Sequence, residues 1–380
     1  MKKTLSLLLF VTILISSLAL FSCGDNSYDD IEFVQTEYAG TTLYVYNWGE
    51  YIADGSDGSK DIIKIFEKKY GITVNYDYFI SNEEMYTQIK NNASYDIIIP
   101  SDYMIDRLIS EDLIQKIDFS NIPNYSNIAD EYKNLYFDPN NEYSVPYNVG
   151  MVGIIYNKEM VDAGDADSQS WGLMWNSKYK NNVVNFNNSR DAFGTAQYLL
   201  GLDVNSANEE DWQAAYNKLL EQKSNVEPAY LMDEIYNKME NENAAIAAYY
   251  AGDCLQMMQE NENLAFYYPT EGTNIFVDSM CIPTAAKNKG AAELFINFML
   301  ETDIAVENAN YLCYASPNKT VWENENYEYH KGTDEYEILY NVPESYQNDP
   351  SKMQYFHDLS TEAPSIQALL TELWTKLGIE

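Results

Sequence analysis

Residues 43–51 read Leu-Tyr-Val-Tyr-Asn-Trp-Gly-Glu-Tyr. The first four residues are apolar or aromatic and uncharged, which predicts a buried strand over residues 43–46. The strand leads into a loop that holds Trp48, Glu50 and Tyr51. In open α/β sheets, ligands bind beyond the carboxyl ends of the strands. A carboxylate between two aromatic rings at such an end suits an organic cation. The alternative is that both rings pack in the core and the carboxylate points to solvent.

The chain that follows alternates between helix and strand patterns. In order, we expect a helix closed by a glycine, a strand, a helix and a strand over residues 61–71, 72–76, 83–90 and 95–100. This order with short loops predicts a mainly parallel sheet with helices on both faces. Tyr103 follows the last of these strands as Glu50 follows the first. We therefore expect the two loops to face the same crevice.

The N-terminus has the pattern of an export signal. Lys2 and Lys3 precede an apolar stretch over residues 5–20, which is short for a membrane span. Cys23 follows a small residue at the predicted cleavage point, and this arrangement resembles a bacterial lipoprotein signal ending at a lipidated cysteine. The alternative is an ordinary signal peptide with an incidental cysteine. Residues 24–40 are polar and acidic and predict a tether outside the fold.

Composition restricts the class of partner. The chain has 59 acidic and 23 basic residues, a net charge of −36. This charge argues against nucleic acid and anionic membrane surfaces, and it is compatible with a cationic ligand or simply with solubility. The length is sufficient for a large core and two lobes. No CxxC pair occurs among Cys254, Cys281 and Cys313. We expect these cysteines to be small buried residues, and one disulfide between two of them is the alternative.

An enzyme is a weaker alternative. The sequence contains no GxSxG, HExxH or phosphate-binding glycine loop. Its histidines are His330 and His357. A carboxylate pair such as Glu50 and Asp278 has the chemistry for general acid–base catalysis, but nothing else in the sequence supports it. We therefore predict a protein that is not an enzyme and that needs neither cofactor nor metal.

Several stretches are shared with one bacterial family in order and in spacing. They lie at residues 43–51, 70–74, 81–86, 95–101, 137–147, 278–279, 282–283, 286–288 and 316–318. In these stretches the chain resembles the bacterial spermidine/putrescine-binding proteins, which are the substrate-binding lipoproteins or periplasmic proteins of polyamine ABC transporters. The resemblance covers nearly all of residues 41–320 and fades in the C-terminal segment.

The resemblance implies an α/β fold of the periplasmic-binding-protein type, with two lobes and a ligand cleft between them. We expect the chain to cross between the lobes near residues 148–152 and 274–278. The expected division is a lipoprotein signal over residues 1–23, a tether over 24–40, a first lobe over 41–150 plus 277–320, and a second lobe over 151–276 plus 321–380.

The resemblance also implies a set of ligand-binding residues. They are Trp48, Glu50, Tyr51, Ser101, Tyr103, Asp191, Tyr250, Phe276, Asp278 and Tyr314. Asn188 stands where the family has a second carboxylate, and Tyr250 and Phe276 stand where members carry Trp. These departures bear on the affinity and on the choice among polyamines. The C-terminal contact stays open, with Asp358 as one candidate.

The chemistry of this set agrees with a polyamine, whose methylenes need apolar walls and whose ammonium groups need carboxylates. Glu50, Asp191 and Asp278 suit the three amines of spermidine, and two of them suffice for putrescine. The function implied is capture of a polyamine and its delivery to an ABC transporter permease in the inner membrane. We expect a monomer on the periplasmic or extracytoplasmic face, which contacts the membrane only through its lipid anchor. The alternatives are a protein of the same fold for another organic cation or small solute, and a surface lipoprotein for sensing or adhesion.

Overall fold

The computed structural model describes residues 28–347 and 349–379. Its strands are β1 (Thr42–Trp48), β2 (Thr73–Phe79), β3 (Ile97–Ile98), β4 (Ser144–Asn157), β5 (Val183–Phe186), β6 (Ala229–Leu231), β7 (Ile246–Tyr250), β8 (Leu264–Tyr267), β9 (Thr273–Cys281) and β10 (Met353–Gln354). Its α-helices are α1 (Ile62–Tyr70), α2 (Asn82–Lys90), α3 (Asp102–Ser110), α4 (Ala163–Ala166), α5 (Ser189–Leu200), α6 (Glu209–Asn225), α7 (Ile235–Glu240), α8 (Ala251–Glu260), α9 (Lys289–Met299), α10 (Thr302–Leu312), α11 (Lys319–Trp322), α12 (Asp334–Tyr340), α13 (Glu344–Gln347), α14 (Leu359–Glu362) and α15 (Pro364–Leu377).

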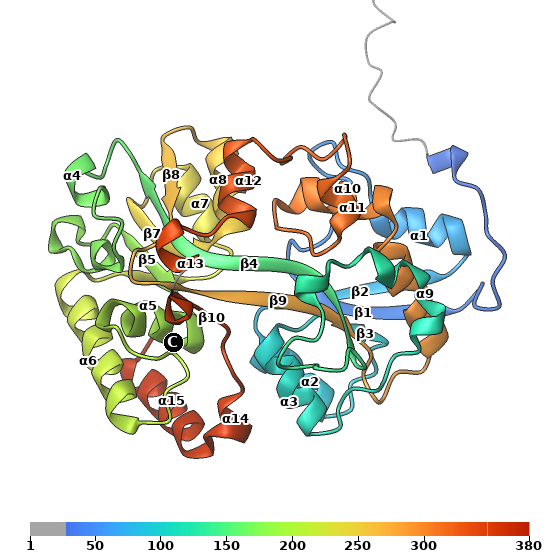
Figure 1. The fold of residues 1–380 in the computed structure, drawn as a ribbon, viewed down its shortest axis with the longest axis horizontal. Coiled ribbons are helices and arrows are strands. Elements are labelled where there is room, and N and C mark those ends of the chain that lie inside the picture. The colour runs from blue at the N-terminus through green and yellow to red at the C-terminus, as the bar shows by residue number, and fades with distance from the viewer. Residues whose placement is uncertain (1–27, 348, 380) are drawn as a thin grey trace, which may run out of the picture.

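The strands form one mixed sheet that is divided between two lobes. Hydrogen-bonded neighbours follow the order β2-β1-β3-β9-β4-β7-β5-β6, with β10 on β9 and β8 on β4. We call the part around β1–β3 the first lobe and the part around β5–β7 the second lobe (Figure 1). The two-lobed α/β fold predicted from the sequence is confirmed.

The prediction of a mainly parallel sheet is right only at the two flanks. β1 runs parallel to β2 and β3, and β5 runs parallel to β6 and β7. The central strands β4 and β9 run antiparallel to each other, and each pairs antiparallel with a flanking strand. The strand predicted over residues 95–100 is shorter in the structure, because β3 pairs with β1 only at Ile97 and Ile98.

β4 and β9 connect the lobes. Figure 1 shows them side by side across the middle of the molecule. Asn148 pairs with Asp278, and Met151 pairs with Ile275. β4 then continues alongside β7 and β8 in the second lobe, while β9 reaches β3 in the first lobe. The two segments that we expected to cross between the lobes are therefore neighbours in one two-stranded connection.

Local sequence accounts for the first helices. Asp61 caps α1 by accepting a hydrogen bond from the backbone three residues on, and Gly71 ends the helix at φ 67°. Glycine adopts this left-handed conformation without a Cβ clash. Ser81 caps α2 in the same way as Asp61 caps α1. The helices predicted over residues 61–71 and 83–90 are thus confirmed, with small differences at their ends.

Each lobe has its own core. In β1, Leu43 and Val45 belong to one first-lobe cluster and Tyr46 to another, as alternation along a strand requires. The second-lobe cluster includes Ile154, Trp171, Val184, Phe186 and Ile246. Tyr327 and Leu339, from a segment that we assigned to the second lobe, join the cluster of Tyr46. The residue boundaries of the lobes stay a prediction.

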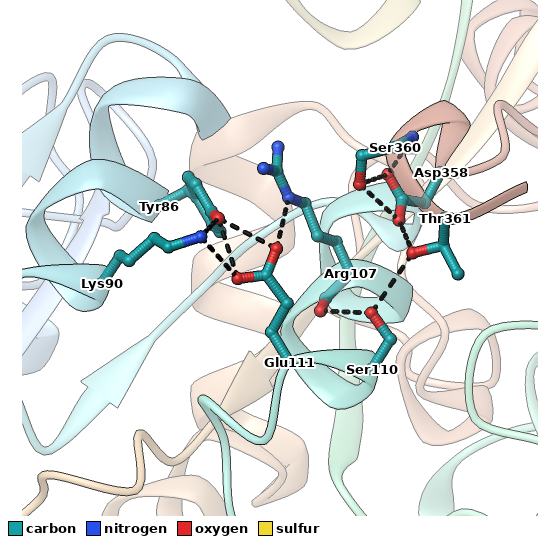
Figure 2. A network of polar contacts seen from close by, with 8 residues as sticks. All are labelled: Tyr86, Lys90, Arg107, Ser110, Glu111, Asp358, Ser360 and Thr361. Atoms are coloured by element: carbon teal, nitrogen blue, oxygen red, sulfur yellow. Dashed lines mark hydrogen bonds and ion pairs between the residues drawn. The ribbon is translucent and has the colours of Figure 1, made fainter. Parts of the chain in front are cut away.

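The C-terminal segment adds further contacts between the lobes. Phe356 packs into the second-lobe core, and its carbonyl accepts a hydrogen bond from Tyr136. The ring of Tyr136 stacks on His357 with centroids 4.5 Å apart. Figure 2 shows a second contact, in which the hydroxyl of Ser110 at the end of α3 lies 3.4 Å from that of Thr361 in α14.

Part of the predicted tether is in contact with the fold. The N–H of Val34 donates to Lys69 O at 2.7 Å, and the hydroxyl of Tyr28 accepts from the N–H of Asp61 at 3.0 Å. Residues 28–40 therefore follow the surface of the first lobe. The predicted lipidation site, Cys23, lies outside the described residues. The other three cysteines are buried free thiols. Among the described residues, no helix is long and apolar enough to cross a membrane.

Candidate functional site

A cavity lies between the two lobes. It comprises about 990 Å³ of space not filled by protein atoms, part of it open to solvent. Its lining includes every residue that we predicted to bind ligand: Trp48, Glu50, Tyr51, Ser101, Tyr103, Asp191, Tyr250, Phe276, Asp278 and Tyr314. The structure thus brings the whole predicted set together. Their roles as ligand contacts stay a prediction.

The loop after β1 forms one wall of the cavity. The ring of Trp48 lies 4.7 Å from that of Phe79, and its buried Nε1 has no hydrogen-bond partner. Glu50 is exposed and adopts φ 48°, a left-handed conformation that is strained for a residue with a side chain. Tyr51 is buried, with its ring edge against Tyr314 at 5.2 Å. Tyr51 therefore packs in the core and also lines the cavity, and the exposure of Glu50 agrees with the alternative that its carboxylate points to solvent.

Asp278 lies on β9 beside the second ligand loop. It is only 4% exposed, and its backbone forms an isolated bridge with Ser101. Oδ2 accepts a hydrogen bond of 2.7 Å from the hydroxyl of Tyr51, whereas Oδ1 is buried without a partner. Burial raises the pKa of Asp278 to about 6, and the nearby hydroxyls of Ser101 and Tyr51 act in the opposite direction. A buried carboxylate with a free oxygen favours a cationic donor.

Asp191 supplies a carboxylate from the second lobe. It stands in the first turn of α5, whose N-cap is Asn188. Its Oδ2 accepts hydrogen bonds of 2.8 Å from the Asn188 amide and 2.8 Å from the Tyr250 hydroxyl. Burial raises the pKa of Asp191, while these two hydrogen bonds lower it. Asn188 thus acts here as a neutral donor to the Asp191 carboxylate.

Aromatic rings line much of the cavity. Tyr250 meets Phe276 edge-on at 5.4 Å, and Phe276 meets Tyr314 at 6.4 Å. Tyr103 enters from α3, packs against the second-lobe core, and donates its hydroxyl to Glu83 at 3.1 Å. These rings come from both lobes, so a ligand in the cavity would contact both at once.

Four cavity acids were not in the predicted set: Glu83, Asp102, Asp233 and Asp253. Asp102 is already satisfied, because it accepts from the backbone N–H groups of Tyr103 and Val277. Asp233 and Asp253 follow β6 and β7 in the second lobe, so the strand-end argument used for Glu50 could have found them. Asp358 does not line the cavity; it caps α14 through Ser360.

The cavity is rich in acids and poor in bases. Among the described residues that line it, Arg190 is the only cation. Its guanidinium donates to Val204 O at 3.3 Å and to Asn205 Oδ1 at 3.0 Å, and it lies 4.3 Å from the centre of the Phe356 ring. The cavity carboxylates have no ion pair with it. The arrangement therefore suits a cationic ligand with apolar segments.

Comparisons with known proteins agree with this geometry. The family described as bacterial extracellular solute-binding proteins matches residues 92–331. The chain is 36% identical to the spermidine/putrescine-binding periplasmic protein of Salmonella typhimurium over 279 residues, which is 73% of this chain and 78% of that protein. It is 29% identical to the putrescine-binding periplasmic protein PotF of Escherichia coli, over 88% of this chain and 91% of that one. The structure of PotD, a spermidine/putrescine ABC transporter substrate-binding protein from Streptococcus pneumoniae, matches with a TM-score of 0.70 and 33% identity, over 89% of this chain and 98% of the other.

Proposed function

The chain belongs to the bacterial extracellular solute-binding proteins, and on that basis we propose that it captures a polyamine, spermidine or putrescine, for delivery to an ABC transporter permease. The observation that carries the proposal is the cavity itself. Aromatic rings from both lobes surround carboxylates that have no ion-pair partner among the described residues, where the buried Oδ1 of Asp278 also has no donor.

The energetics of such a site favour a flexible polycation. Each charge-assisted hydrogen bond contributes roughly 1.5–3 kcal/mol net, and each cation–π contact roughly 0.5–2 kcal/mol. The rings of Tyr250, Phe276 and Tyr314 supply apolar area for the methylenes between the amines. An anion would meet unpaired carboxylates instead, and a neutral sugar would leave them without counter-charge.

We further propose that the protein works as a monomer on the extracytoplasmic side of the membrane, held by a lipid on Cys23. The relatives from Salmonella typhimurium and Escherichia coli are described as periplasmic. The basic, apolar and small-residue pattern before Cys23 supports a lipoprotein signal. Mass spectrometry of the protein purified from membranes tests this anchor: we expect a diacylglycerol-modified N-terminal cysteine, and an unmodified N-terminus further along the chain would contradict it.

Calorimetric titration of the purified protein tests the ligand class. We expect saturable binding of spermidine or putrescine at micromolar concentration or below, with weaker binding of cadaverine or spermine where the amine spacing fits less well. Choline serves as a control cation with a single charge. Binding of choline as tight as that of every polyamine would favour the alternative of a general organic-cation protein. Absence of binding to all of these amines would contradict the proposal.

A further inference from the structure

The N-terminal segment runs along helix α1 from one end to the other. At the start of the helix, the hydroxyl of Tyr28 accepts a hydrogen bond of 3.0 Å from the backbone N–H of Asp61, the N-cap residue. At its end, the N–H of Val34 donates to the carbonyl of Lys69 at 2.7 Å. The first N–H groups and the last carbonyls of a helix lack partners within the helix. Residues 28–34 therefore satisfy one such group at each end of α1.

Two glycines make room for aromatic side chains of this segment. A Cβ atom at Gly71, which ends α1, would lie 3.0 Å from the ring of Phe33. A Cβ atom at Gly290, at the start of α9, would overlap the hydroxyl of Tyr38. Tyr38 also packs against the first-lobe core. Residues 28–40 are therefore bound to the first lobe at both ends of α1 and at the start of α9, and we call this segment the strap.

The strap lies at one end of the molecule. Figure 1 shows it at the edge of the first lobe, at the far end of the long axis from the second lobe. The contacts of the strap with α1 and α9 all join it to the first lobe. Motion of the second lobe relative to the first therefore leaves these contacts unchanged.

Docking of the strap limits how far the fold can move from a lipid on Cys23. Five residue steps separate Cys23 from Tyr28, and they span at most about 17 Å whatever path they take. If the strap were free, the eighteen steps from Cys23 to Thr41 would span at most about 60 Å. The docked strap thus removes most of that reach.

Charge does not hold this end of the molecule to a membrane. Three lysines of α1 and of the turn before it are paired with acids: Lys60 with Glu307, Lys64 with Asp61, and Lys69 with Glu301. The chain as a whole has a net charge of −36, which anionic headgroups repel. A short connection to the lipid, and not adsorption, therefore sets which face lies toward the membrane.

We propose that the strap holds the α1 end of the first lobe toward the lipid bilayer that carries the anchor, in the anchored protein away from its permease. This inference rests on the proposed lipid at Cys23 and adds to it the face that the protein turns to the membrane. Because the strap is bound to the first lobe, the second lobe stays free to move when the cavity closes around a ligand.

Energy transfer from the protein to the membrane tests this orientation. The lipidated full-length protein is placed in phosphatidylcholine vesicles that carry an acceptor dye on the lipid headgroups. A donor dye is attached at Lys64→Cys on α1 or, in a separate sample, at Gln213→Cys on α6 of the second lobe, which are both exposed positions. The native thiols of the fold are buried, so the dye reacts with the introduced cysteine.

We expect transfer from the α1 donor to exceed that from the α6 donor by about twofold or more, since the strap keeps α1 close to the anchor. Phe33→Ser combined with Tyr38→Ser loosens the strap and should make the two donors equal. Leu220→Ser is the matched control, because it removes an exposed apolar side chain from α6 and leaves the strap intact. The control should keep the difference seen in the wild type.

Three results would overturn the orientation. The first is equal transfer from the two donors in the wild type. The second is an unchanged difference in the double variant, once circular dichroism has shown that this variant is folded. The third is a difference that appears only when anionic lipid is added to the vesicles, which would make charge its cause in place of the strap.

Hydrogen exchange on the wild type covers the case in which the double variant does not fold. The amides of Val34 and Gly40 donate to the carbonyls of Lys69 and Gly71, so they should exchange at least about tenfold more slowly than amides without a partner. Fast exchange at both would contradict the docked strap. Slow exchange in a protein whose N-terminus carries no lipid would overturn the proposed anchor, and the orientation with it, while the strap itself would stand.

Discussion

Asp278 combines burial, one hydrogen bond and one oxygen without a donor. Asp278→Asn keeps the shape and the hydrogen bond from Tyr51 but removes the charge. We expect polyamine affinity to fall by roughly 2–4 kcal/mol, because an ammonium would lose its partner in a buried site. Calorimetry on the folded variant measures this change. Affinities within a factor of two of the wild type for every polyamine would make Asp278 a structural residue.

The raised pKa of Asp278 predicts how polyamine binding depends on pH. In the free protein the pKa of Asp278 is raised to about 6, mainly by burial. The ligand binds the ionised carboxylate, so affinity falls as the pH drops through 6, by at most about tenfold per pH unit for one group. Spermidine titrations between pH 5 and pH 8 measure this slope. In Asp278→Asn the slope near pH 6 should flatten, and an unchanged slope would assign it to another group.

Trp48 tests the contribution of an aromatic wall. Trp48→Ala should weaken binding more than Trp48→Phe, because the phenyl ring keeps a face for the ammonium and part of the apolar area. We expect roughly 1–2 kcal/mol between the two variants, measured by calorimetry. Equal losses in two folded variants would mean that Trp48 acts through its indole N–H, whose Nε1 is buried without a partner.

The site residues differ in whether the sequence alone could identify them. Trp48 and Glu50 could be predicted because a strand end is visible in a short stretch. The contact of Tyr51 with Asp278 joins residues 227 positions apart, which no local pattern records. Asp253 also follows a strand end, but its hydrogen bonds from Tyr236 and Tyr314 come from other elements and leave no local pattern. Resemblance located the wall aromatics, and only the structure identified their hydrogen-bond partners.

At the scale of elements, Glu111 links α2 to the end of α3. Figure 2 shows its carboxylate accepting hydrogen bonds from Tyr86, Lys90 and Arg107. Burial alone would raise the pKa of Glu111, but these three donors together hold it below its ordinary value. A carboxyl with a lowered pKa stabilises the folded protein above its unfolded pKa, and this stabilisation is lost as the pH falls.

We therefore expect Glu111→Gln to reduce the free energy of unfolding by about 1 kcal/mol at pH 7, a value typical of a partly exposed network. The difference from the wild type should shrink below about pH 4. Glu142→Gln is the matched control, because the Lys116–Glu142 pair is more exposed and should contribute less. Thermal unfolding at pH 7 and pH 3.5 measures both. Equal effects of the two variants at pH 7 would contradict the role of the network.

Elements also differ in how well the sequence predicts them. The helices over residues 61–71 and 83–90 carry their own caps, so the pattern located them closely. The direction of β4 and β9 was not predicted, because antiparallel pairing in the middle of the sheet follows from the chain crossing twice between lobes. Residues 28–40 were expected to form a tether, since their acidic composition does not reveal the backbone contacts they make on the first lobe.

At the scale of the whole molecule, the acids of the cavity face one another across the two lobes. Asp278 lies on β9, whereas Asp191 and Asp253 come from second-lobe helices. Repulsion between these charges favours open lobes, whereas a polycation between them favours closed lobes. The ligand therefore shifts the population from open to closed, by an amount set by the difference between its affinities for the two states. Asp233 also lines the cavity from the second lobe, so Asp191 is one of three second-lobe carboxylates there.

Solution scattering tests the closure. We expect saturating spermidine to reduce the radius of gyration of the wild type. Asp191→Asn should diminish this reduction more than Tyr103→Phe does, because only the former removes a second-lobe charge. Scattering curves that superimpose with and without ligand would contradict closure, although binding itself would stand.

A crystal structure of the protein with spermidine is the most direct test of the central claim. We predict density for the polyamine in the cavity, with one ammonium nitrogen within about 3 Å of Oδ1 of Asp278 and another within about 3 Å of Asp191. The methylenes should lie against the rings of Tyr250 and Tyr314. An empty cavity at saturating ligand, or spermidine bound elsewhere on the protein, would contradict the account.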